Sequence, residues 1–149
     1  MTLGGKLVLE TVDAILIGTI QPIEQDNMVV SGELKPAPKI FRETCRINWN
    51  QPVKNIYDFI RGLSPYPAAW TELNIPDSDT VSVKIFESGK EVLPHSFTPG
   101  TILTDNKTYL KVAATDGFVH IKTIQFPGKK RLAISELLRG YNFPDGATF

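Results

Sequence analysis

The stretch TVSVKIF at residues 80–86 alternates apolar side chains with side chains of other kinds. Ser82 and Lys84 fall on one face of this stretch, opposite the aliphatic residues between them. A period of two is typical of a half-buried β-strand. Short stretches with strand character also occur at residues 69–73, 100–104, 108–113 and 118–126. Turn dipeptides separate several of them, so the pattern predicts a mainly β fold with a few helices, arranged as a small barrel or sandwich.

The alternation slips within residues 118–126, which predicts a β-bulge near Lys122 or Thr123. Outside the strands, two helices are predicted at residues 50–62 and 135–140. Asn50 is the expected cap of the first and Ser135 that of the second, while Gly62 is expected to end the first helix. The tail after Phe143 is expected to be frayed.

A third helix is predicted at residues 4–20, where apolar residues recur with a period near 3.6. Its apolar stripe is wide and requires a partner surface. We interpret this helix as the last piece of an upstream domain that the chain lacks, while packing on the body of the same domain is the alternative. Residues 21–45, with their prolines and spaced cations, read as a linker.

Basic residues are unevenly distributed although the net charge is zero. Residues 35–61 hold six basic and two acidic residues, and residues 107–139 hold seven and two. The segments 1–33 and 62–106 are acidic. Folding that brings the two basic segments together creates a basic face, as nucleic-acid binding requires. Ordinary scatter of surface charge is the alternative.

No catalytic or metal-binding constellation is recognisable in the sequence. His95, His120 and the single cysteine, Cys45, lack partners at a useful spacing, and we expect packing or surface roles for them. Trp49 and Trp70 are expected in the core rather than as platforms for bases. The apolar runs are too short to span a membrane and no signal peptide is evident, so we expect a cytoplasmic protein without a membrane partner.

One cluster stands out, PGKKR at residues 127–131. Three adjacent cations on a turn suit contacts with several phosphates. A solvated lysine run on the surface is the alternative reading of this cluster.

Several stretches, in this order, resemble the C-terminal half of methionyl-tRNA formyltransferases. They are KIFRETCRINW at residues 39–49, IYDFIRGLSPYPAAWT at 56–71 and VKIF at 83–86. Residues 100–103, Gly117 and residues 127–138, which contain GKK and a terminal helix, complete the order. Asn48 stands where the family has an aspartate. Residues 3–20 resemble the last helix of that family's catalytic domain.

The resemblance implies a barrel like an oligonucleotide-binding fold, preceded by a linker and an N-terminal helix. It divides the chain into the last helix of a truncated catalytic domain (1–20), a basic linker (21–45) and a C-terminal β-barrel that binds tRNA (46–149). The implied contacts with initiator methionyl-tRNA come from Lys129, Lys130 and Arg131 on the turn and from Lys35, Lys39 and Arg42 in the linker.

In the family, the upstream domain takes the formyl group from 10-formyltetrahydrofolate. The resemblance therefore implies that this chain alone binds no cofactor and is inactive, and that its partners are the tRNA and its own catalytic domain within a monomeric enzyme. Two alternatives remain. The chain could be the structural C-terminal domain of another folate-dependent formyltransferase, of the nucleotide-sugar type, that binds no RNA. It could also be a stand-alone domain that dimerises through residues 4–20.

Overall fold

The computed structural model describes residues 2–28, 32, 36–76 and 78–149. The chain divides into two compact units, Met1–Pro38 and Lys39–Phe149. The first unit contains the helix α1 (Thr2–Ile17) and a short 3-10 helix, η1 (Gln25–Asn27). Helix α1 thus begins and ends slightly before the predicted range of 4–20. It buries none of its residues, and its apolar side chains are exposed.

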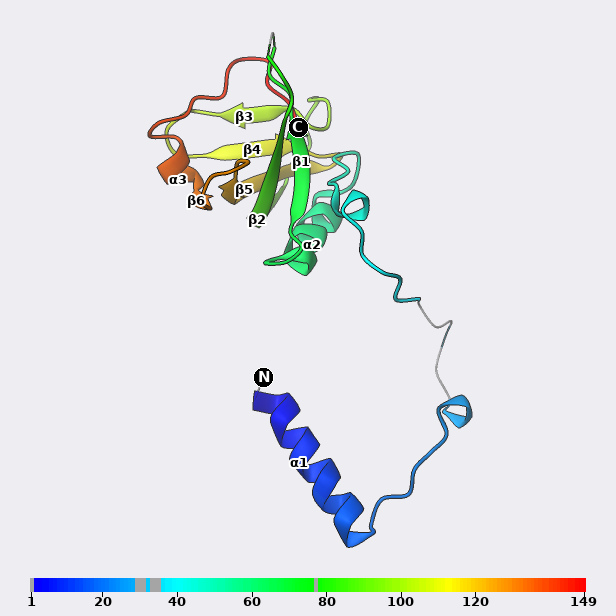
Figure 1. Ribbon diagram of the computed structural model, residues 1–149. Helices are drawn as coiled ribbons and strands as arrows, with labels where there is room; N and C mark the ends of the chain where they lie inside the picture. Colours follow the sequence, from blue (N-terminus) through cyan, green and yellow to red (C-terminus); the bar gives the residue numbers. More distant parts are fainter. Residues whose placement is uncertain (1, 29–31, 33–35, 77) are drawn as a thin grey trace. The chain divides into compact units, whose positions relative to one another are not determined.

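Within the described residues, the second unit contains a six-stranded antiparallel sheet in the order β1-β2-β5-β4-β3, with β6 paired to β5 (Figure 1). The predicted mainly β fold is therefore confirmed, although the strands follow an open path rather than a closed ring. The strands are β1 (Ala69–Leu73), β2 (Val81–Val92), β3 (Ile102–Thr104), β4 (Leu110–Ala113), β5 (Gly117–Gln125) and β6 (Leu132–Ala133).

The C-terminal segment bridges the two outer strands of this path. Thr148 pairs with Asn74, next to the end of β1, and with Thr101, next to the beginning of β3. The backbone N–H of Asn74 donates to the carbonyl of Thr148 at 2.8 Å, and the reciprocal bond is 3.0 Å long. The prediction of a frayed tail after Phe143 is wrong, because the tail supplies hydrogen bonds that the edge strands would otherwise lack.

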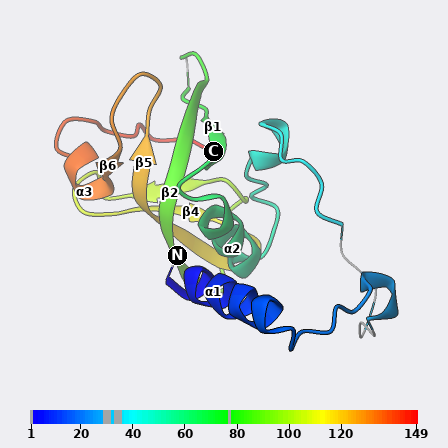
Figure 2. The same ribbon diagram turned by 60° about the horizontal axis from the view of Figure 1, so that its bottom comes forward.

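Helix α2 (Val53–Leu63) packs against β2, and Figure 2 shows it lying along this side of the sheet. It buries Val53, Ile56 and Ile60 in the core, which also takes aliphatic residues from β1, β2, β4 and β5. The spacing of three and four residues places these side chains on one face of the helix. The amphipathic helix predicted at residues 50–62 is confirmed in type and in its buried face.

The ends of α2 differ from the prediction. The N–H of Val53 donates to a carboxylate oxygen of Asp116 at 2.7 Å, so a side chain from the turn before β5 caps the helix in place of Asn50. Gly62 lies inside the helix rather than ending it. The sequence could not reveal the cap, because its donor and acceptor lie 63 positions apart.

The last helix, α3 (Ile134–Leu137), is shorter than predicted and lies beside β6. Ser135 lies within it rather than at its N-cap. The carboxylate of Glu136 instead accepts the backbone N–H of Ala133 at 3.4 Å. Among the described residues, none of the helices combines the length and the hydropathy that crossing a membrane requires.

The pairing of β2 with β5 shifts its register on both sides of Glu87. Phe86 on β2 and Lys122 on β5 each lie outside the paired positions, so each strand carries one extra residue at this point. The bulge predicted near Lys122 or Thr123 is confirmed. A bulge bends its strand and changes the direction of neighbouring side chains, and this one shapes a pocket described below.

Candidate nucleic-acid interface

Two adjoining pockets, each of about 290 Å³, share Arg42, Ser82 and Lys84 in their walls. One pocket extends to Trp70 on β1, and the other extends to the turn at residues 126–128. We call the two pockets together the Arg42–Lys84 groove. It joins a residue of the predicted linker, the outward face of β2 and the turn that precedes β6.

Trp70 holds the linker residue in place at this groove. Its indole N–H donates to the carbonyl oxygen of Arg42 at 2.7 Å. The guanidinium carbon of Arg42 lies 5.2 Å from the centroid of the indole, and that of Arg46 lies 5.6 Å away. Both distances are within the range of cation–π attraction. The indole therefore fixes the backbone of Arg42 and keeps two positive charges beside the groove.

Trp70 is only half-buried, so the prediction that it lies in the core is wrong. Along β1 its neighbours Ala69 and Thr71 point inward and are buried, which leaves Trp70 on the outward face. Trp49 lies in the core as predicted. Its indole N–H donates to the hydroxyl of Thr71 at 3.0 Å, and its ring stacks on Phe149 with centroids 5.9 Å apart.

Arg42 and Lys84 are exposed, and among the described residues neither has a carboxylate within salt-bridge distance. Arg46 differs, because it forms an ion pair with Glu72. Cations that are not neutralised by the protein are available to an anionic ligand. Sequence reasoning missed Lys84 as a site residue, although its position on the polar face of the 80–86 alternation was the signal that could have identified it.

The turn at residues 126–129 is fixed by two hydrogen bonds. The N–H of Lys129 donates to the carbonyl of Phe126 at 3.1 Å, and the side-chain amide of Gln125 donates to the carbonyl of Lys129 at 2.7 Å. Gly128 takes a positive φ of 67°, which favours glycine. The turn presents Lys129 and Lys130 as exposed side chains.

The three turn cations do not form one cluster. Lys129 and Lys130 line an apolar pocket of about 510 Å³ beside α3. Arg131 extends elsewhere, with its guanidinium carbon 3.6 Å from the centroid of the Phe86 ring and one nitrogen 3.3 Å from the carbonyl of Pro65. The predicted turn site is therefore split between two sides of the turn.

The predicted linker cations are also distributed. Arg42 shares a pocket wall with residues 127 and 128 of the turn. Lys39 is exposed, with its ammonium 5.3 Å from the ring centroid of Phe41, and Lys35 lies outside the described residues. Of the three predicted linker residues, Arg42 is thus the one that the described structure brings beside the turn.

His95 and Cys45 take part in packing. The Nδ1 of His95 accepts the N–H of Phe97 at 3.1 Å, so its Nε2 carries the proton and donates to the carbonyl of Gly117 at 2.9 Å. The ring of His95 lies 4.4 Å from that of the buried Phe118, centroid to centroid. Cys45 is buried. The packing roles predicted for His95 and Cys45 agree with these contacts.

His120 belongs to a small charged cluster on β2, β4 and β5. Its Nε2 lies 2.7 Å from a carboxylate oxygen of Glu91, and the ammonium of Lys111 lies 3.3 Å from the same oxygen. The hydrogen bond from His120, followed by that from Lys111, lowers the pKa of Glu91 below its ordinary value. Within the described part of the chain, no group of three or more histidine, cysteine or acidic residues is placed to hold a metal ion.

Comparisons of sequence place these features in a family. The family model described as the formyl transferase C-terminal domain matches residues 39–142. The methionyl-tRNA formyltransferase of Bacteroides thetaiotaomicron is 63% identical over 146 residues, and the aligned part covers 98% of this chain and 45% of the relative. That of Bacteroides fragilis is 61% identical over 145 residues, covering 97% and 45%. The chain thus spans just under half the length of these relatives.

The fold has solved counterparts. A crystal structure of HypX from Aquifex aeolicus in complex with tetrahydrofolic acid aligns with a TM-score of 0.58 at 21% identity, covering 89% of this chain and 22% of HypX. A variant of HypX aligns with a TM-score of 0.61 over 97% of this chain. At this identity the likeness concerns the fold alone. The sheet, its flanking helices and the match to residues 39–142 together establish that the chain belongs to the formyl transferase C-terminal domain family.

Proposed function

We propose that this chain is the RNA-binding part of a methionyl-tRNA formyltransferase and that it holds initiator methionyl-tRNA by its phosphate backbone. The observation that carries the proposal is the Arg42–Lys84 groove. There a cation from the linker side and one from β2, neither with a carboxylate in salt-bridge distance among the described residues, line pockets that reach residues 126–128 of the turn. Relatives at 61–63% identity that are named methionyl-tRNA formyltransferase support this substrate. The reaction itself, transfer of a formyl group from 10-formyltetrahydrofolate, belongs to an upstream domain of a cytoplasmic enzyme.

The proposed contacts are electrostatic. Arg42 and Lys84 bind phosphates from the shared wall of the two pockets, and the exposed lysines of the turn extend the basic surface. Contacts of this kind position the RNA without reading its sequence. The proposed tRNA-binding residues are Lys129, Lys130, Arg131, Lys35, Lys39 and Arg42, to which we add Lys84.

The N-terminal part has a different role in the proposal. Residues 1–20 are the last helix of the catalytic domain, residues 21–45 are the linker, and residues 46–149 are the tRNA-binding barrel. The exposed apolar side chains of α1 support this division, since they offer a surface for that domain. In the proposal this helix is covered by its own chain, and the intact enzyme is a monomer.

The alternative of a structural domain in a formyltransferase for nucleotide sugars is less well supported. The relatives that cover nearly the whole chain are named for the tRNA enzyme. The dimerising stand-alone domain also lacks support, because those same relatives are about twice as long as this chain.

The test measures binding of the 149-residue chain to initiator tRNA across a salt series. Loss of both cations in the variant Arg42→Gln/Lys84→Gln should lower the slope of log K against log salt by about 2, since each phosphate contact contributes about 0.9. Lys107 and Arg139 are exposed cations outside the groove, so Lys107→Gln/Arg139→Gln is the charge-matched control.

The control variant should lose much less of the slope. Equal losses in both variants would show that only total charge matters. An unchanged affinity in the groove variant at low salt would contradict the proposed interface.

A further inference from the structure

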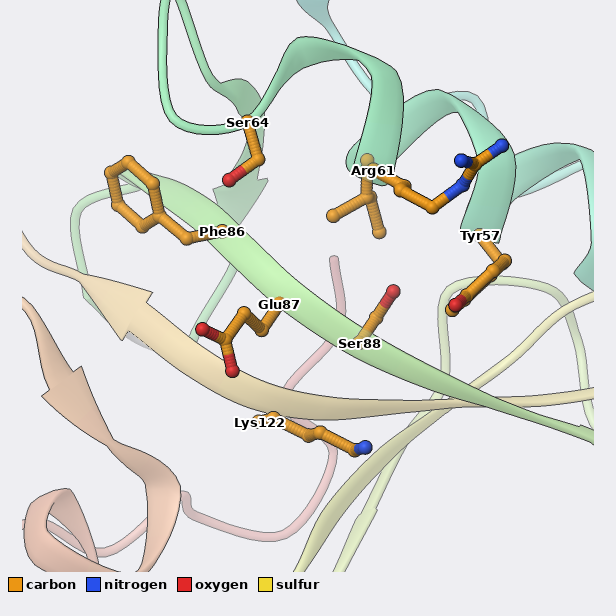
Figure 3. Close-up of a pocket in the computed structure, with 8 residues that line it drawn as sticks. Tyr57, Arg61, Ser64, Phe86, Glu87, Ser88 and Lys122 are labelled. Atoms are coloured by element: carbon orange, nitrogen blue, oxygen red, sulfur yellow. The ribbon is translucent and has the colours of Figure 1, made fainter. Parts of the chain in front are cut away.

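A second basic pocket, of about 310 Å³, lies between α2 and the bulged part of the β2–β5 pair (Figure 3). Strands β2 and β5 contribute Phe86 and Lys122, the residues left unpaired by the register shifts. Helix α2 contributes residues of one turn, and Ser64 follows the end of the helix. The side chains that matter below are those of Tyr57, Arg61, Ser64, Phe86, Ser88 and Lys122. None of the contacts described for the Arg42–Lys84 groove uses these side chains.

The pocket carries positive charge from its own walls. Arg61 lies on the α2 side and Lys122 on the β5 side, and Figure 3 shows them at opposite borders of the cavity. Glu87 also lines it. Asp58 pairs with Arg61 at 3.4 Å, but this carboxylate is shared with Lys54 at 2.8 Å. These five charged residues leave a net positive charge at the pocket.

Two further cations lie behind the aromatic walls. The ammonium of Lys90 lies 5.0 Å from the ring centroid of Tyr57, and the guanidinium carbon of Arg131 lies 3.6 Å from that of Phe86. Both rings line the pocket. Arg61, Lys122, Lys90 and Arg131 therefore lie at or behind the walls of a cavity whose nearby acids in the described part of the chain are Glu87 and Asp58, and the potential inside it favours an anion.

Ser88 supplies the polar group inside the pocket. Its hydroxyl oxygen is buried and hydrogen-bonds to no other group in the described part of the chain. Figure 3 shows this oxygen directed into the cavity from β2. Buried hydroxyl groups nearly always have a hydrogen-bond partner, so this hydroxyl has a hydrogen bond left to donate to an oxygen atom that enters the pocket.

Gly89 leaves room for Lys122 beside β2. A Cβ atom built on Gly89 lies 3.4 Å from the Cε and 4.0 Å from the ammonium of Lys122. The lysine side chain thus runs directly past the glycine, which the bulge at Lys122 permits. The result is an ammonium that lines the same pocket as the Ser88 hydroxyl.

We propose that this pocket binds a phosphate group of an RNA backbone, with Arg61 and Lys122 providing charge and Ser88 donating a hydrogen bond. The proposal rests on the proposed function and adds a second phosphate site to it. Lys84 of the groove and Ser88 lie four positions apart on β2, so the two sites follow one another along the same strand. The proposed pocket also gives a role to Arg131, which lies apart from the groove but contacts Phe86 in the wall of this pocket.

The first experiment titrates the ¹⁵N-labelled 149-residue chain with inorganic phosphate and follows backbone amides and the Nε–H of Arg61 by NMR. Shifts should concentrate at residues 86–88 and at Arg61, and Ser88→Ala and Lys122→Gln should each weaken them several-fold. Both variants should fold, since one removes a single hydroxyl and the other changes an exposed side chain. Shifts that persist unchanged in both variants, or no shifts at millimolar phosphate, would overturn the site.

The second experiment distinguishes an RNA phosphate from free phosphate. Lys122→Gln should lower the salt slope of tRNA binding by about 1, Lys122→Arg should retain it, and Lys107→Gln should have a smaller effect. Phosphate binding without any change in tRNA binding would reject the RNA source and with it the proposal. If Arg42→Gln/Lys84→Gln weakens tRNA binding and Lys122→Gln does not, this pocket fails while the proposed function stands. If neither variant weakens it, both fail.

Discussion

Helices α1 and α2 are both rich in apolar residues, yet they differ completely in burial. Helix α2 has 11 residues and buries three of them against the sheet. Helix α1 has 16 residues and buries none in this chain. Leu7, Val8, Leu9, Val12, Ile15, Leu16 and Ile17 are each at least 45% exposed. An apolar helical pattern therefore predicts that a partner surface exists, but it does not identify the molecule or domain that carries it.

The difference gives the two helices separate roles in stability. Removing a buried side chain from α2 loses transfer free energy and leaves a cavity in the core. Removing an apolar side chain from α1 removes no contact within the folded second unit, because that unit begins at Lys39. The following predictions, ordered from the largest expected effect to the smallest, use this contrast.

The largest effect is expected at Ile60, which is fully buried on α2. Ile60→Ala should lower the free energy of unfolding by about 2 to 5 kcal/mol, the usual range for such truncations. Leu7→Ala on α1 is the matched variant and should change it by less than about 0.5 kcal/mol. Urea unfolding followed by the fluorescence of the two tryptophans, Trp49 and Trp70, measures both.

A large loss in Leu7→Ala would contradict the division of the chain. It would mean that α1 contributes to the stability of the second unit. A small loss of unfolding free energy in Ile60→Ala would show that the core around α2 rearranges to fill the cavity. That result would contradict the role assigned to the buried face of this helix.

Much of the fold could be predicted from the sequence because the signals are local. The alternation at residues 80–86 predicted β2, and the slip in alternation at residues 118–126 predicted the bulge at Lys122. The tail and the cap could not be predicted in this way. Thr148 bridges two sheet edges, and Asp116 caps α2 from another turn, so both features depend on contacts between distant segments.

The candidate site was predictable in part. The charge of the linker and of the GKK turn was visible in the sequence, and Arg42 lines a pocket together with residues 126–128 of the turn. Side chains of consecutive residues can point in different directions. Arg131 therefore lies on Phe86, while Lys129 and Lys130 line another pocket. Trp70 was misplaced because strand membership alone does not determine which face a residue occupies.

A medium effect is expected at the cap of α2. Asp116→Ala removes the acceptor of the Val53 N–H and should lower the free energy of unfolding by about 1 kcal/mol. Asp116→Asn retains a side-chain oxygen and should lose less. Helix α1 has no such long-range cap among its described contacts. Thermal unfolding of the two Asp116 variants measures how strongly the second unit depends on this contact between α2 and the sheet.

The smallest effect is expected at Asp105, in the turn between β3 and β4. Its carboxylate accepts the hydroxyl of Thr108 and the backbone N–H groups of Lys107, Thr108 and Tyr109, and these bonds, the hydroxyl first, hold its pKa well below the ordinary value. A lowered pKa in the folded state stabilises the fold above the unfolded value of about 3.9, and this stabilisation is lost as the pH falls through the folded value.

Asp105→Asn should therefore be slightly less stable than the parent chain at neutral pH, and the difference should shrink as the pH falls below about 4. Glu10→Gln is the control on α1, where Glu10 forms only an exposed pair with Lys6 at 3.7 Å. Urea unfolding at a series of pH values compares the two. A difference that widens on acidification would contradict the assigned pKa direction. An acid response in Glu10→Gln equal to that in Asp105→Asn would break the contrast between the two units.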